Sequence, residues 1–141
     1  MKRFLTYSMF AATALVAVAG SASAQNLKAE IPFAFRAGTA LLQPGTYDVV
    51  TRTAAASTMY QLRNRDTNES VMVFRQGTRD AAKAWLAAGR PTLAFRCSGT
   101  NCALAEVWTG GASSSFFTAP KSAAGDPVRI AEVRMTAAKA D

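Results

Sequence analysis

The chain contains no histidine. Histidine is the commonest general base and metal ligand, so its absence excludes Ser–His and Cys–His nucleophilic pairs and the usual histidine-based metal sites. The sequence also lacks a G-x-S-x-G elbow, a Walker loop and a Rossmann fingerprint, and Gly110-Gly111 is typical of a turn. We therefore expect no cofactor and no metal site.

Paired carboxylates are also missing from the sequence pattern. Glycoside hydrolysis can proceed without histidine, but it needs two carboxylates that act together. The acidic residues stand singly, mostly in predicted turns or on outward strand positions: Glu30, Asp48, Asp66, Glu69, Asp80, Glu106, Asp126 and Glu132. This pattern favours a non-catalytic protein, and a small carboxylate-dependent hydrolase or lyase is the alternative.

Long apolar runs are absent beyond residue 24. The chain starts with Lys2 and Arg3, continues with an apolar stretch over residues 9–19, and then has small residues at Ala22 and Ala24, as a signal-peptidase site requires. A membrane-spanning helix needs about 20 apolar residues, roughly twice the length of this stretch. We predict a signal peptide over residues 1–24, export to the periplasm or the extracellular space, and no membrane span after cleavage.

Cleavage after Ala24 leaves 117 of the 141 residues, enough for a single β domain over 25–136 with a frayed tail over 137–141. It also leaves 14 basic and 9 acidic residues, a net charge of +5. A basic exported protein meets anionic surface polymers or envelope proteins rather than nucleic acid. Because the basic residues stand singly, an ordinary solvated surface is the alternative explanation.

Cysteine is limited to Cys97 and Cys102. Their C-x4-C spacing differs from the C-x-x-C of a redox site, and two thiolates without histidine cannot complete a structural zinc site. Export places the pair where disulfides persist. We predict a structural Cys97–Cys102 disulfide.

Short apolar runs separated by turn residues predict an all-β fold, an antiparallel sandwich or barrel of about seven or eight strands. Pro44-Gly45 predicts a type II turn. Residues 78–88 predict one short helix or a loop, with Thr78 as N-cap, Gly89 as the stop, and Trp85 and Leu86 packed on the sheet. The expected strands are Ile31–Phe35, Thr46–Val50, Met59–Arg65, Ser70–Arg75, Thr92–Cys97, Cys102–Trp108, Ser114–Thr118 and Val128–Thr136.

The turn-forming residues 66–69 predict a hairpin between the third and fourth of these strands. We expect Arg65 opposite Ser70 and Arg63 opposite Met72, with Tyr60, Leu62, Val71 and Val73 on the core face. The other face would carry the candidate binding residues Arg63, Arg65, Met72 and Phe74. It is either a partner-binding patch or a partly covered layer with arginine stems over the apolar side chains.

The cysteines predict a second hairpin. With Cys97 opposite Cys102, Phe95 lies opposite Leu104 and Leu93 opposite Glu106, which places Glu106 on the core face. A carboxylate there is costly unless it is paired, so we expect an arginine partner from a neighbouring strand. The alternative is a functional acid with a raised pKa.

Two N-terminal segments carry a resemblance to a known group. They are Ile-Pro-Phe-Ala-Phe at residues 31–35 and Leu-Gln-Pro-Gly-Thr-Tyr at residues 42–47. The chain is similar there to uncharacterised secreted β-domain proteins common in acidobacteria, whose pattern is I-P-F-x-F followed by L-P-x-G-x-Y; Gln43 departs from it. Residues 93–95 and 104–108 resemble the second half of the group. The resemblance implies a secreted β domain and no particular activity or site residues.

Together these observations predict a non-catalytic exported β module. Its expected partner is an envelope protein or an anionic surface polymer, and Arg63, Arg65, Met72 and Phe74 are its candidate surface.

Overall fold

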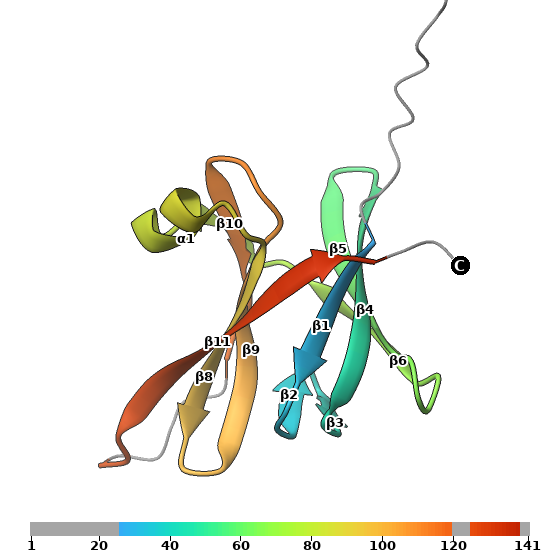
Figure 1. The fold of residues 1–141 in the computed structure, drawn as a ribbon, viewed down its shortest axis with the longest axis vertical. Helices are drawn as coiled ribbons and strands as arrows, with labels where there is room; N and C mark the ends of the chain where they lie inside the picture. Colours follow the sequence, from blue (N-terminus) through green and yellow to red (C-terminus); the bar gives the residue numbers. More distant parts are fainter. Residues whose placement is uncertain (1–25, 120–124, 139–141) are drawn as a thin grey trace, which may run out of the picture.

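The computed structural model describes residues 26–119 and 125–138, so the predicted signal peptide lies outside the described residues. The described part contains eleven strands and one short helix, which confirms the all-β prediction (Figure 1). These elements are β1 (Leu27–Ile31), β2 (Phe35–Ala37), β3 (Ala40–Leu42), β4 (Gly45–Ala54), β5 (Ser57–Asn64), β6 (Ser70–Phe74), β7 (Gly77–Asp80), α1 (Lys83–Ala88), β8 (Thr92–Ser98), β9 (Asn101–Trp108), β10 (Ser113–Phe116) and β11 (Val128–Ala137).

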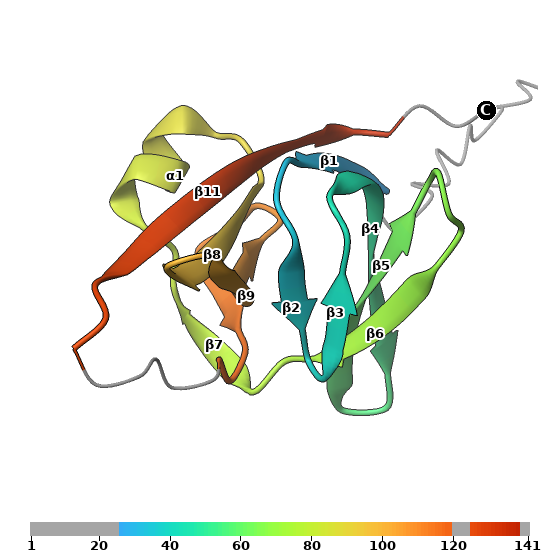
Figure 2. The same cartoon turned by 90° about the horizontal axis from the view of Figure 1, so that it is seen from below.

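The strands form one sheet that curls into a nearly closed barrel. Its order is β3-β2-β9-β8-β11-β1-β4-β5-β6, and β10 and β7 extend it from β9. One half of the sheet is β3-β2-β9-β8, and the other half is β1-β4-β5-β6. Strand β11 links them, because its residues 128–134 pair with β8 and its residues 135–137 pair with β1. Figures 1 and 2 show this long strand crossing from the β8–β9 hairpin to β1. The last strand therefore includes Ala137, one residue beyond the predicted domain boundary.

The main core fills the interior of the barrel. Phe35 of β2 packs edge-to-face on Tyr47 of β4 and on Phe95 of β8, with ring centroids 5.3 and 5.2 Å apart. All three rings are buried. Because large aromatic side chains contribute most of the apolar burial in such a core, Phe35 ties both halves of the sheet together.

The strand count exceeds the predicted seven or eight for identifiable reasons. The predicted strand Ile31–Phe35 is wrong: β1 ends at Ile31, and β2 begins at Phe35. Pro32 has no N–H to donate to a ladder, so the chain leaves one strand there and enters another. The other additional strands are β3, which follows a tight turn at Gly38, and β7.

The predicted type II turn at Pro44-Gly45 is also wrong. That turn needs a positive φ at its glycine, whereas Gly45 opens β4 and is not among the glycines with positive φ. A Cβ at Gly45 would lie 3.0 Å from Nδ2 of the buried Asn64. The glycine therefore provides space for Asn64.

Asn64 also explains why the β5–β6 register differs from the prediction by two residues. Arg63 pairs with Ser70 and Gln61 with Met72. The Asn64 carboxamide oxygen accepts hydrogen bonds from the backbone N–H groups of Asp66 and Thr67 at 2.8 and 3.2 Å. The loop between the strands therefore begins at Asn64. A shift of two residues leaves each side chain on its predicted face, and the core face predicted for this hairpin is confirmed.

The helix is shorter than residues 78–88, because Thr78 lies in β7 opposite Ser115. Thr78 is therefore not the N-cap; Ala82 holds that position without a side-chain hydrogen bond. Gly89 ends the helix in the left-handed conformation, as predicted. Trp85 is buried and stacks on Trp108, whereas Leu86, also expected to pack on the sheet, is 48% exposed.

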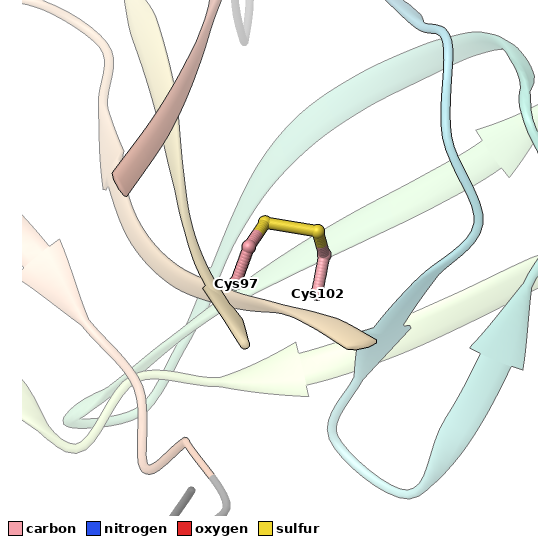
Figure 3. The surroundings of a disulfide bond; sticks show 2 residues. All are labelled: Cys97 and Cys102. Atoms are coloured by element: carbon pink, nitrogen blue, oxygen red, sulfur yellow. A yellow bond between two sulfur atoms is a disulfide. The ribbon is translucent and has the colours of Figure 1, made fainter. Parts of the chain in front are cut away.

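The β8–β9 hairpin confirms part of its prediction. Cys97 and Cys102 form a buried disulfide between the two strands (Figure 3). By restricting so short a loop in the unfolded chain, the disulfide stabilises the fold by about 2 kcal/mol. Phe95 lies opposite Leu104, but a bulge follows and Ala94 then pairs with Glu106.

The extra residue Ala105 reverses the alternation of side chains along the rest of β9. Val107 therefore faces the main core, and Trp108, which strict alternation would place in the core, lies on the outer face with Trp85 and Ala94. The prediction that Glu106 faces Leu93 on the core face is therefore wrong.

The buried Tyr47 hydroxyl yields a test of this core. It donates to the carbonyl of Gln43 at 2.5 Å. Burial raises the pKa of Tyr47 above its ordinary value of 10.0; a hydrogen bond with Asn64 opposes this shift and the charge of Glu69 adds to it. Because the folded-state pKa lies above the unfolded one, the resulting stabilisation is present below pH 10 and is lost as pH rises through the folded-state pKa.

We therefore expect the free energy of unfolding to fall more steeply above pH 10 in the wild type than in Tyr47→Phe. Denaturant titrations of both proteins between pH 8 and about pH 11.5 measure this difference. Parallel pH profiles would contradict the placement of Tyr47.

Candidate functional site

The structure brings three of the four predicted site residues together. Met72 and Phe74 point outward from β6 and are 38% and 60% exposed, and Arg63 lies outward on the adjacent β5. Met59, which is opposite Phe74, extends this apolar surface. Arg65 is not on a strand but in the loop after β5. We call Met59, Met72 and Phe74 the apolar patch.

The two arginines predicted for this face, Arg63 and Arg65, are already engaged within the protein. Arg65 Nε donates to Asp48 Oδ1 at 2.7 Å in an ion pair. Arg63 Nε donates to Asn68 Oδ1 at 2.7 Å. These contacts use part of the hydrogen-bonding capacity that an anionic ligand would need, so the predicted face offers mainly apolar contact.

A second outer surface carries arginines in a different setting. Strand β2 lies parallel to β9 with Arg36 beside Ala103, and β8 lies antiparallel to β9 with Arg96 beside the same Ala103. Both arginines alternate with buried residues and are exposed. The register thus places two outward guanidinium groups on either side of one small side chain, with about 10 Å between the two Cα atoms from the usual strand spacing.

Exposed apolar side chains border this pair. Leu41 of β3 lies opposite Arg36 and is 60% exposed, and Ile130 of β11 lies opposite Arg96 and is 56% exposed. The five residues cross five neighbouring strands. We call Leu41, Arg36, Ala103, Arg96 and Ile130 the arginine row.

The guanidinium groups of the arginine row have no ion pair or side-chain hydrogen bond with any residue in the described part of the chain. Two acidic residues lie near one end of the row. Glu132 is two residues beyond Ile130 on the same face, and Asp126 accepts a hydrogen bond from Ser98. Neither of these two acids forms an ion pair with Arg36 or Arg96.

Sequence reasoning missed the arginine row because Arg36 and Ala103 are distant in the chain. The spacing of residues within β2 gives no indication that it pairs in parallel with β9. The outward positions of Arg36 and Arg96 could be read from local alternation, but not their proximity.

Glu106 lies on the outer face of β9 and is half-buried. It accepts a hydrogen bond from the hydroxyl of the buried Ser114, and no described arginine forms an ion pair with it. Glu132 flanks Ala94 from the other side, because both acids pair with that residue. Ala94, between the two acids, is buried in a cluster with Trp85 of α1 and Trp108.

A shallow hollow of about 800 Å³ lies between α1 and the turn at Gly110-Gly111. Its described lining includes one acid, Asp80, one base, Lys83, and the ring of Trp108. Within residues 26–119 and 125–138, no three His, Cys, Asp or Glu side chains are grouped to hold a metal ion.

No protein-family model matches the chain, and no curated protein or solved structure matches it. Among the described residues, no helix has the length and apolar character needed to cross a membrane.

The Ser114–Glu106 contact predicts a contrast between two substitutions. Glu106→Gln keeps an oxygen that accepts the Ser114 hydroxyl and should change the free energy of unfolding by less than about 0.5 kcal/mol. Glu106→Leu leaves the buried hydroxyl without a partner and should lower it by about 1–3 kcal/mol. Chemical denaturation measures both, and equal stability of the two variants would show that the contact is not formed.

Proposed function

We propose that this protein is a non-catalytic exported β module that binds an anionic polymer of the cell envelope through the arginine row. The observation that carries the proposal is the pair Arg36 and Arg96, two exposed guanidinium groups that flank Ala103 and have no ion-pair partner among the described residues. Guanidinium groups match carboxylate and phosphate oxygens in charge and in geometry.

The arrangement of the row favours a polymer over a protein partner. Protein interfaces carry apolar residues at their centre and charges at their rim. The arginine row has the reverse order, with Arg36 and Arg96 in the middle and Leu41 and Ile130 at the two ends. An extended polyanion crossing the strands meets both positive charges in succession.

Export is supported by two features. The predicted signal peptide over residues 1–24 directs the chain out of the cytoplasm. The Cys97–Cys102 disulfide is of a kind that persists in oxidising compartments, where envelope polymers are found. The periplasm or the extracellular space is therefore the proposed location.

The alternative function, a carboxylate-dependent hydrolase or lyase, has weaker support. Glu106 is the acid on which it would depend, and its carboxylate is held by Ser114. The position between Glu106 and Glu132 is filled by the buried Ala94. Binding of an anion by the arginine row requires no pair of carboxylates.

The test compares two double variants that change the net charge equally. Arg36→Ser/Arg96→Ser removes the guanidinium groups of the row, and Arg63→Ser/Arg65→Ser removes those of the two arginines that the sequence predicts as binding residues. We expect the first to weaken binding to immobilised polygalacturonate roughly tenfold at low salt, because each of the two exposed charge pairs contributes up to about 1 kcal/mol and tenfold corresponds to about 1.4 kcal/mol. The second should bind within about twofold of wild type, and wild-type binding should weaken as salt is raised.

Equal loss of affinity in both double variants would attribute binding to net charge alone and refute the arginine row. Failure of the wild type to bind the polysaccharide would refute the proposal outright. Polyglutamate serves as the comparison polymer: tighter binding to it, with the same dependence on Arg36 and Arg96, would identify an acidic protein as the ligand instead.

A further inference from the structure

Strand β6 is one end of the described sheet and pairs there only with β5. The Asn64 N–H donates to the Glu69 carbonyl, and the Arg75 N–H donates to the Thr58 carbonyl. Backbone groups alternate in direction along a strand. Those of Ser70, Met72 and Phe74 therefore point away from β5, to an edge that no described strand occupies.

This edge lacks the features that keep edge strands apart. Exposed edges are commonly protected by charged residues, proline or a bulge. Strand β6 reads Ser-Val-Met-Val-Phe and contains neither charge nor proline. The β2–β3 turn approaches it at the inward side chain of Val73, where a Cβ on Gly38 would lie 3.6 Å from Val73 Cγ1, and does not pair with its backbone.

The residues on either side of β6 carry opposite charges. Glu69 precedes the strand and Arg75 follows it; both are exposed, and neither has an ion-pair partner in the described residues. A strand with a negative start and a positive end is complementary to an antiparallel copy of itself. This charge pattern favours a second copy of the chain as the partner of the edge.

We propose that β6 pairs antiparallel with β6 of a second copy of this chain, about a two-fold axis at Met72. Met72 then lies opposite Met72 of the second copy, and Ser70 lies opposite Phe74 at both ends. These residues are the ones whose backbone groups point to the free edge, so the register forms regular hydrogen-bonded pairs. Such an interface is isologous, as in most homodimers.

The same register places Glu69 of each copy opposite Arg75 of the other. These are non-hydrogen-bonded positions, where side chains of antiparallel strands approach most closely. The pairing also joins the two apolar patches, so that the exposed Met72 and Phe74 of both copies share one surface. Along the paired strands the apolar residues lie at the centre, and the Glu69–Arg75 pairs lie at the two ends, on the opposite face from Met72 and Phe74.

This inference is independent of the proposed polymer binding, since the arginine row lies on β3, β2, β9, β8 and β11. Each can fail alone: polymer affinity tests the row, and oligomeric state tests the β6 edge.

Sedimentation equilibrium measures the dissociation constant of the proposed dimer for the purified wild type and for variants with reversed charges at Glu69 and Arg75. We expect wild type to dimerise, Glu69→Arg and Arg75→Glu each to weaken dimerisation at least about tenfold, and Glu69→Arg/Arg75→Glu to restore it. Restoration is specific to this register, because the double variant recreates opposite charges at both ends.

A second substitution tests the centre of the interface. Met72→Lys places two like charges directly opposite each other at the axis and should abolish the dimer. Leu86→Lys, at an exposed apolar position on α1, is the matched control and should leave dimerisation unchanged. Circular dichroism checks that each variant is folded. If Met72→Lys does not fold, the charge-reversal variants still test the dimer.

A wild type that remains monomeric at all concentrations would overturn the proposal. So would a double charge reversal that stays as weak as the single variants, or a dimer lost equally on Leu86→Lys. If the β6 edge instead accepts a strand of another protein, wild type is monomeric, and crosslinks from position 72 reach that protein alone.

Discussion

Strand β2 lies parallel to β9, with Arg36 beside Ala103, and this contact joins the β2–β3 hairpin to the β8–β9 hairpin. The packing of Phe35 stabilises it, because this ring contacts Tyr47 on one half and Phe95 on the other. Strand β11 closes the same junction from the other side by pairing with both β8 and β1. Without the β2–β9 contact, Arg36 and Arg96 would lie on separate surfaces.

The bulge at Ala105 also shapes the outer surface. It turns Trp108 outward, where Trp85 stacks on it and α1 covers Ala94. The outer face of the β8–β9 hairpin is thus divided into a covered end beneath α1 and an open end that carries Ala103 and Arg96. At the covered end, Glu106 accepts a hydrogen bond from Ser114, and we therefore assign it a role in stability. The open end holds the arginine row.

Much of the fold is predictable from local sequence, and the exceptions have physical causes. Alternation of apolar residues identifies the core faces of β5, β6 and β8, and the compartment and spacing of Cys97 and Cys102 identify their disulfide. Alternation cannot reveal the bulge at Ala105, because the residues around it are of the same types as in a regular strand. Nor can it reveal that a glycine after proline serves to accommodate Asn64 rather than to turn the chain. The arginine row depends on pairing between distant strands, so no local pattern indicates it.

The nearly closed sheet places Arg36 and Arg96 on either side of Ala103, and the proposed function depends on this placement. Backbone nuclear Overhauser effects in the isotope-labelled protein test it most directly, because paired strands bring backbone protons into close contact. The account predicts cross-strand effects from Ala103 to both Arg36 and Arg96. Effects from Ala103 to Arg96 alone, with none to Arg36, would mean that β2 does not pair with β9 and would contradict the account.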